Sequence, residues 1–185
     1  MCRSISCRSK MIPALPSTLR NTARCSTSNE QKLTKEVLRE MNKMQRTVDE
    51  LHALVREVGD RPASIRYRAA ASPFLADFYM GVENILKRIA QFQEAGLPDS
   101  ATWHADLLDW FCDPTHAQLP ALLDTAMRIE IDSYRRFRHV AHHGYALDLE
   151  WNRMKEGIEE LGPTYQRFRE RVVDYLEERS GRELS

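Results

Sequence analysis

Seven apolar residues in the first third of the chain recur at alternating steps of four and three, without a break. They are Val37, Met41, Met44, Val48, Leu51, Val55 and Val58. This spacing is the a/d pattern of a helix whose apolar seam lies against another helix. The sequence therefore predicts an amphipathic, coiled-coil-like helix over residues 30–58. Its partner is either the rest of the same chain or a second copy of it.

Helical spacing of apolar residues continues through the remainder of the chain, and no segment alternates as a strand does. Gly59 and Pro62 are expected to end the first helix, with residues 59–71 as a linker. The further helices are expected to begin at Ser72-Pro73, at Ser100, after Pro120 and at Asp148, with a break at Gly162-Pro163 before the last one. The predicted fold class is all-α, an up-and-down helical bundle with an added N-terminal helix.

Residues 1–29 differ in composition from the rest, because they are rich in Ser and Arg and contain no acidic residue. We expect them to be disordered. An organelle transit peptide has a similar composition, and an over-long start with Met11 as the initiator fits equally well. The four cysteines have no metal-ligand spacing, so they are expected to be free thiols in a reducing cytoplasm.

Overall charge gives the chain no general attraction for nucleic acid. Lys and Arg number 27, as do Asp and Glu, so any contact with RNA must depend on a local patch. The candidate patch consists of Arg128, Arg135, Arg136 and Arg138. No run of eighteen apolar residues occurs, so no membrane contact is expected.

The segment 134–145 reads Y-R-R-F-R-H-V-A-H-H-G-Y and contains Arg138, four further residues, His143, one residue and Tyr145. A guanidinium can neutralise a phosphate, and a neutral imidazole can take a proton from a ribose 2'-hydroxyl, so neither needs a metal or a cofactor. His143 reaches the Arg138 face of an ideal helix only if the helix loosens near Gly144. By residue types alone, the segment is either a candidate RNA-cutting site or a solvated helix end.

Residues 137–145 resemble the signature of the HEPN superfamily, specifically of the HepT-like toxins. In that signature an arginine, a polar residue, three more positions, a histidine, any residue and a tyrosine occur together, and His139 fits the polar position. Residues 77–85 and 103–108 resemble the first and second core helices of the family. The expected HEPN domain is 72–180. Close relatives often carry a second arginine where this chain has His142, so a phosphate contact there would be weaker or pH-dependent.

The resemblance implies a toxin that cuts RNA without a metal, by attack of the 2'-hydroxyl on its own phosphate. In this chain His143 is expected to be the base or the acid, and Arg138 to stabilise the transition state. His139 or His142 would assist. Glu83 is a candidate for orienting Arg138 or the histidine.

The resemblance also implies partners. Similar proteins place two motifs face to face, so a homodimer is expected, and an MntA-type nucleotidyltransferase antitoxin would attach adenylate to Tyr145 and silence the toxin. Two alternatives remain open from the sequence. One is a catalytically silent HEPN module that binds, or is modified by, a nucleotidyltransferase, and the other is a coiled-coil adaptor that works through residues 37–58.

Overall fold

The computed structural model describes the backbone of residues 17–143 and 149–180, and the side chains of residues 28–141 and 149–180. These residues form five helices, namely α1 (Ser17–Val58), α2 (Ile65–Phe92), α3 (Trp103–Trp110), α4 (Thr125–His143) and α5 (Trp151–Ser180). Within the same residues there is no β-strand, only one isolated bridge between Cys112 and Leu123. The prediction of an all-α helical bundle is therefore confirmed.

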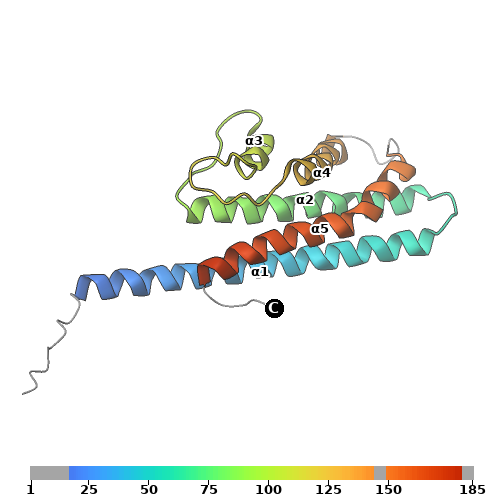
Figure 1. The fold of residues 1–185 in the computed structure, drawn as a ribbon. Helices are drawn as coiled ribbons and strands as arrows, with labels where there is room; N and C mark the ends of the chain where they lie inside the picture. Colours follow the sequence, from blue (N-terminus) through green and yellow to red (C-terminus); the bar gives the residue numbers. More distant parts are fainter. Residues whose placement is uncertain (1–16, 144–148, 181–185) are drawn as a thin grey trace, which may run out of the picture.

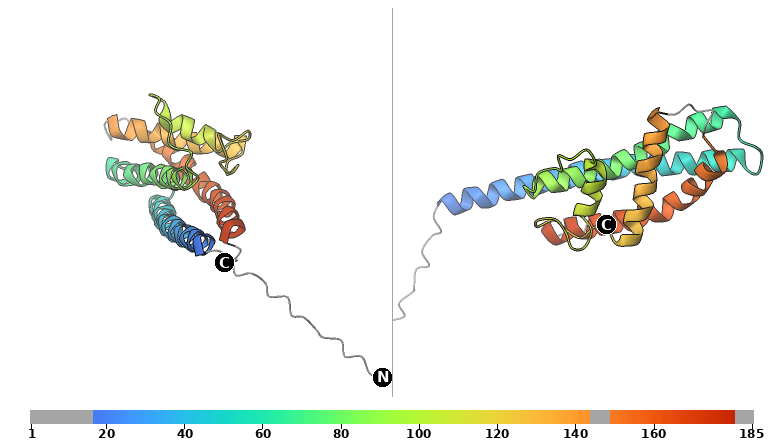
Figure 2. Two further views of the ribbon diagram at one scale, coloured as in Figure 1. Left: turned by 90° about the vertical axis from the view of Figure 1, so that its left-hand side faces the viewer. Right: turned by 90° about the horizontal axis from the view of Figure 1, so that it is seen from above.

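Three long helices form the body of the molecule, and the two shorter ones lie on one side of it. Figure 1 shows α1 and α2 as an antiparallel pair with α5 alongside, and α3 and α4 on the side of α2 away from α1. Seen from above, α4 crosses the long helices at a steep angle (Figure 2). The α4 helix packs mainly on α2, and its Arg138 reaches Glu83 of that helix.

The apolar seam of α1 is covered by helices of the same chain. Six of its seven residues are buried and Val55 is partly buried. The seam faces α2 and α5, and the Tyr165 hydroxyl of α5 donates a hydrogen bond to the Met41 carbonyl over 2.8 Å. A Cβ atom built on Gly81 of α2 would lie 2.4 Å from Met44 Cγ, so the missing side chain permits this close approach. The sequence left open whether the same chain or a second copy covers this seam, and in the structure helices of the same chain cover it.

Several helix ends differ from the sequence prediction. The first helix begins at Ser17, inside the tail that was expected to be disordered, and α2 begins at Ile65, inside the expected linker. The α2 helix passes through Pro73, and α5 passes through Gly162 and Pro163 without a break. An internal proline costs a helix about 3 kcal/mol. Each large apolar side chain buried beside it contributes about 1.5–3 kcal/mol, so packing on both sides of the proline outweighs the local preference.

An aromatic cluster fixes α4 on the bundle. The Phe78 ring of α2 meets the Tyr134 ring of α4 edge to face, with centroids 5.1 Å apart, and meets the Tyr165 ring of α5 at 6.4 Å. The α4 helix starts where the Asp124 carboxylate accepts a hydrogen bond from the Met127 amide over 2.8 Å, which is a regular N-cap.

The cap predicted for the last helix, Asp148, lies outside the described residues. No helix in the described ranges is long and apolar enough to span a bilayer.

Candidate functional site

Arg138 and Glu83 meet across two helices. The Arg138 Nη1 atom of α4 lies 3.3 Å from the Glu83 Oε2 atom of α2. The Glu83 side chain is only 4% exposed, whereas the Arg138 side chain is 25% exposed. Arg138 also lies over the Tyr79 ring, 5.9 Å from its centroid. The guanidinium is thus held from below by a carboxylate and a ring, while part of it remains open to solvent.

The α2 helix presents a column of polar side chains toward α3 and α4. Tyr79, Glu83 and Lys87 follow one another at steps of four, so they share one face of the helix. Lys87 Nζ lies 3.0 Å from Glu83 Oε1. The buried Tyr79 hydroxyl donates a hydrogen bond to the His104 carbonyl over 3.2 Å. Burial, together with the nearby Glu83 charge, raises the pKa of Tyr79 well above its usual range, so the phenol stays protonated and keeps this bond.

His104 of α3 is the member of the site that the sequence reasoning missed as a functional residue. Its Nδ1 atom lies 2.5 Å from Glu83 Oε2, the same oxygen that Arg138 contacts. Its ring stacks on the Trp103 ring, with centroids 3.6 Å apart. A buried carboxylate is costly unless it is paired, and Glu83 is paired with Lys87, His104 and Arg138. The available signal was a histidine on the same helical face as the buried Leu107 and Leu108.

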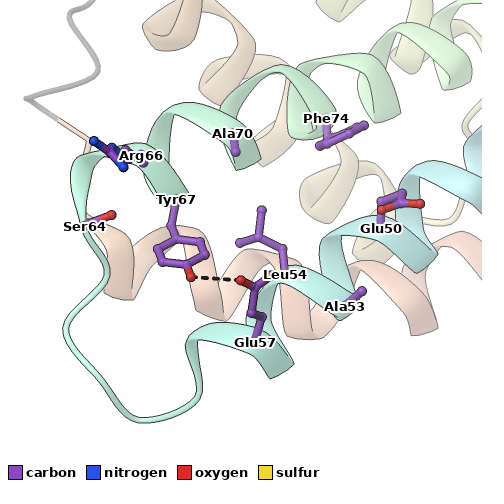
Figure 3. Close-up of a pocket in the computed structure, with 9 residues that line it drawn as sticks. All are labelled: Glu50, Ala53, Leu54, Glu57, Ser64, Arg66, Tyr67, Ala70 and Phe74. Atoms are coloured by element: carbon purple, nitrogen blue, oxygen red, sulfur yellow. Dashed lines mark hydrogen bonds between the residues drawn. The ribbon is translucent and has the colours of Figure 1, made fainter.

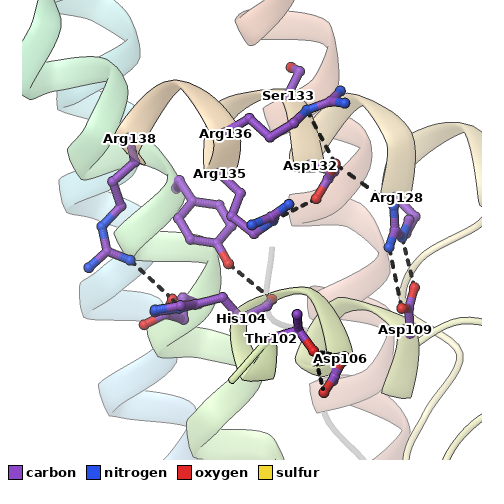
Figure 4. Close-up of polar contacts among 12 residues, drawn as sticks. Thr102, His104, Asp106, Asp109, Arg128, Asp132, Ser133, Arg135, Arg136 and Arg138 are labelled. Carbon is purple, nitrogen blue, oxygen red and sulfur yellow. Dashed lines mark hydrogen bonds and ion pairs between the residues drawn. The ribbon is translucent and has the colours of Figure 1, made fainter. Parts of the chain in front are cut away.

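The arginine patch expected on α4 is interleaved with carboxylates. Asp132, which is 7% exposed, lies 2.6 Å from Arg135, 3.4 Å from Arg136 and 3.9 Å from Arg128. Arg128 also makes two bonds to Asp109 of α3, of 2.8 and 3.3 Å. Figure 4 shows the Arg128–Asp109 pair between α4 and α3, and Arg138 separate from the Asp132 pairs. The patch is therefore largely neutralised within the protein, and its positive field is weaker than four arginines suggest.

The remaining residues of the predicted site lie at or beyond the limit of the described side chains. His139 is exposed on α4, next to Arg138. His142 and His143 form the last two residues of α4, but their side chains lie outside the described residues. Tyr145, the predicted modification site, and Gly144, the predicted helix stop, are also outside them. The structure thus joins Arg138 to Glu83 and adds His104, while the side-chain positions of His142, His143 and Tyr145 stay predictions.

Two pockets lie away from this site. One, of 540 Å³, is formed between the end of α1 and the start of α2, where the Tyr67 hydroxyl donates a 3.0 Å hydrogen bond to Glu57 (Figure 3). This bond raises the pKa of Tyr67. The other, of 660 Å³, lies between the α1–α2 turn and the first turn of α5, and Arg61 and Trp151 are among its lining residues. Neither pocket is lined by residues of the Arg138 site.

Comparison with known proteins identifies the domain that carries these residues. A family model described as HepT-like protein matches residues 70–179, which include Glu83, His104 and Arg138. The comparison with curated proteins and the comparison with solved structures each gave no significant match. The matched range covers more than half of the chain and extends from α2 through α5. The chain therefore belongs to the HepT-like family of the HEPN superfamily.

Proposed function

We propose that this protein is the toxin half of a toxin-antitoxin pair and acts in the cytoplasm as a metal-independent endoribonuclease. The observation that carries the proposal is the placement of Arg138. In a HepT-like domain, this arginine is held by the buried Glu83, is partly open to solvent, and precedes the motif histidine His143 on the same helix. A fixed, accessible guanidinium is what a phosphate needs as its binding partner.

The proposed reaction is attack of a ribose 2'-hydroxyl on the adjacent phosphate. His143 acts as its base or its acid, and Arg138 stabilises the extra negative charge of the transition state. A guanidinium has five N–H donors, and the one bond to Glu83 leaves others for phosphate oxygens. His139 and His142 would assist from the same end of α4.

A homodimer completes this proposal. Ile129 and Val140 are 56% and 49% exposed, and both lie on α4. They are eleven residues apart, close to three helical turns, so they share one face. An exposed apolar face on the helix that carries the motif supports a dimer in which two such helices meet, which would place two motifs together.

Control by an antitoxin is the second part of the proposal. An MntA-type nucleotidyltransferase would attach adenylate to Tyr145, seven residues after Arg138. The added phosphate carries negative charge, so it would pair with the arginine that the substrate phosphate also needs. Modified protein would therefore bind RNA less well and cut it far more slowly.

The position of Glu83 beside Arg138 also fits a second candidate function, a HEPN module without catalytic activity. Its carboxylate already offsets the charge of Arg138, and it would oppose the approach of a phosphate. A catalytically silent module, which serves only as partner or substrate of a nucleotidyltransferase, would tolerate such a carboxylate. The departure at His142 points in the same direction, because an arginine at that position would have supplied a further cation.

The test uses purified full-length protein and single-stranded RNA, with EDTA present. We expect wild type to cut the RNA and to leave 2',3'-cyclic phosphate ends, which mass spectrometry identifies. His143→Ala should lose about 10²-fold or more in rate. The matched control is His116→Ala, since the His116 ring stacks on Trp110 and belongs neither to the motif nor to the Glu83 cluster. Wild type that accepts adenylate from the nucleotidyltransferase but never cuts RNA would instead support the silent module.

A further inference from the structure

We propose that His104 is a second catalytic histidine of this site, and that it takes the proton from the 2'-hydroxyl while Glu83 holds its ring in place. The inference rests on the proposed ribonuclease function and assigns the base that the motif alone leaves open. His143 then serves as the acid.

The contact with Glu83 sets which ring nitrogen of His104 can act. An ionised carboxylate can only accept hydrogen bonds, so the Nδ1 atom 2.5 Å from Glu83 Oε2 must carry the hydrogen. In the neutral ring the lone pair is therefore on Nε2, on the far side from Glu83. A carboxylate that fixes the tautomer of a histidine, and stabilises the cation formed when it takes a proton, is the orienting partner of a general base.

The ring of His104 is also fixed in position. It stacks on Trp103, and the Tyr79 ring lies at an angle to it, with centroids 6.5 Å apart. The Tyr79 hydroxyl holds the His104 carbonyl, so the backbone is tied down as well. The His104 side chain is 32% exposed while Glu83 is 4% exposed. A substrate can thus reach the imidazole but not the carboxylate that orients it.

His104 and Arg138 converge on a single oxygen atom. Both contact Glu83 Oε2, one from α3 and the other from α4, and Figure 4 shows the two labelled side chains approaching each other between these helices. A phosphate that binds Arg138 would therefore stand beside the imidazole. This is the arrangement that a base needs, because a ribose 2'-oxygen is adjacent to the phosphate it attacks.

In the resulting step, His104 Nε2 takes the proton of the 2'-hydroxyl while the 2'-oxygen forms a bond to phosphorus. The bond from phosphorus to the 5'-oxygen breaks, and His143 gives that oxygen a proton. The products are a 2',3'-cyclic phosphate and a free 5'-hydroxyl. Proton and charge balance without any further reactant, and the proton returns from His104 when the active site resets through water.

The test separates base from acid by changing the leaving group. The substrate is RNA in which sulfur replaces the bridging 5'-oxygen at the scissile position. Its downstream fragment leaves as a thiolate, which needs no proton from an acid. We expect His143→Ala to recover most of its rate on this substrate. His104→Ala and His104→Asn should remain about 10²-fold slow or slower on both substrates. Asn can still donate to Glu83 but lacks Nε2, so it distinguishes catalysis from anchoring of α3, and His116→Ala should cut like wild type.

A second measurement reads the tautomer without any activity. Nitrogen-15 NMR of the neutral His104 ring should show the hydrogen on Nδ1 in wild type, and a loss of this preference in Glu83→Gln. A hydrogen on Nε2 in wild type would overturn the assignment, as would His104→Asn that cuts oxygen RNA at the wild-type rate. So would rescue of His104→Asn by the sulfur substrate, which would make His104 the acid. If wild type cuts neither the oxygen nor the sulfur substrate, the proposed ribonuclease function is wrong, and the role of His104 is wrong with it.

Discussion

Replacing Glu83 with glutamine should destabilise the protein more than any other single carboxylate-to-amide change on α4 or α2. The substitution keeps the shape but removes a charge that is 4% exposed and is shared by Lys87, His104 and Arg138. Removing one partner of a buried ion pair costs about 3–5 kcal/mol when the other partner stays buried. Here the three basic side chains are 25–32% exposed, so water can partly replace the carboxylate. We therefore expect a loss of about 2 kcal/mol.

The matched control is Asp132→Asn. Asp132 is also buried, at 7% exposure, and has three arginine partners. These partners lie on its own helix at steps of three and four, where each pair contributes only about 0.2–0.5 kcal/mol. Glu83, in contrast, connects α2 to α3 and α4. The two variants thus remove similar charges, but only one of them removes ties between helices.

Thermal unfolding followed by circular dichroism at 222 nm measures both effects. For a chain of this length about 1 kcal/mol corresponds to about 2–4 °C in Tm, so Glu83→Gln should lower Tm by about 4–8 °C. Asp132→Asn should lower Tm by about half of that or less. If the order were reversed, or if both variants melted like wild type, Glu83 would not be the polar centre that joins the three helices.

Three further predictions concern other parts of the molecule. The double variant Met44→Asp, Leu51→Asp places two charges in the α1 seam, where these residues are 2% and 0% exposed, and should lower the free energy of unfolding in urea by several kcal/mol. The control Asn42→Asp, at an exposed position of α1, should not, and equal unfolding midpoints would mean that the seam is not covered. Ile129→Arg should shift sedimentation toward monomer, and an unchanged sedimentation coefficient would exclude the α4 face as the dimer contact. Tyr145→Phe should keep RNA cleavage yet gain no adenylate from a cognate nucleotidyltransferase with ATP, and equal gain by wild type and variant in intact-mass analysis would exclude this tyrosine.

The sequence predicted the parts of the fold that depend on periodicity. The a/d spacing of α1 is a local pattern, and any helix with such a seam must cover it, so its burial followed directly. The partner that covers it was not predictable, because the choice between α2 and α5 of the same chain and another copy depends on contacts between distant segments. The helix ends predicted at Pro73 and Pro163 were wrong for the same reason. The local cost of each proline is offset by packing that sequence spacing does not reveal.

The site was foreseen only where a motif marked it. Arg138 was chosen from residue type and its spacing to His143, and Glu83 from the resemblance, and the two do meet. His104 was not assigned a role because its contact with Glu83 joins two helices whose relative position no local pattern determines. The neutralisation of the arginine patch, in contrast, was readable. Asp132 stands three and four residues from its arginine partners, which is the spacing of ion pairs on a helix.

The most direct test of the proposed activity compares two arginines on α4. Arg138 is 25% exposed and tied to Glu83, whereas Arg136 is 64% exposed and pairs with Asp132. Initial rates of RNA cleavage in EDTA should fall about 10²-fold or more for Arg138→Ala and stay near wild type for Arg136→Ala, because only Arg138 acts on the transition state. If Arg138→Ala cuts as fast as Arg136→Ala, or if EDTA abolishes cleavage by wild type, a metal-independent site centred on Arg138 is wrong.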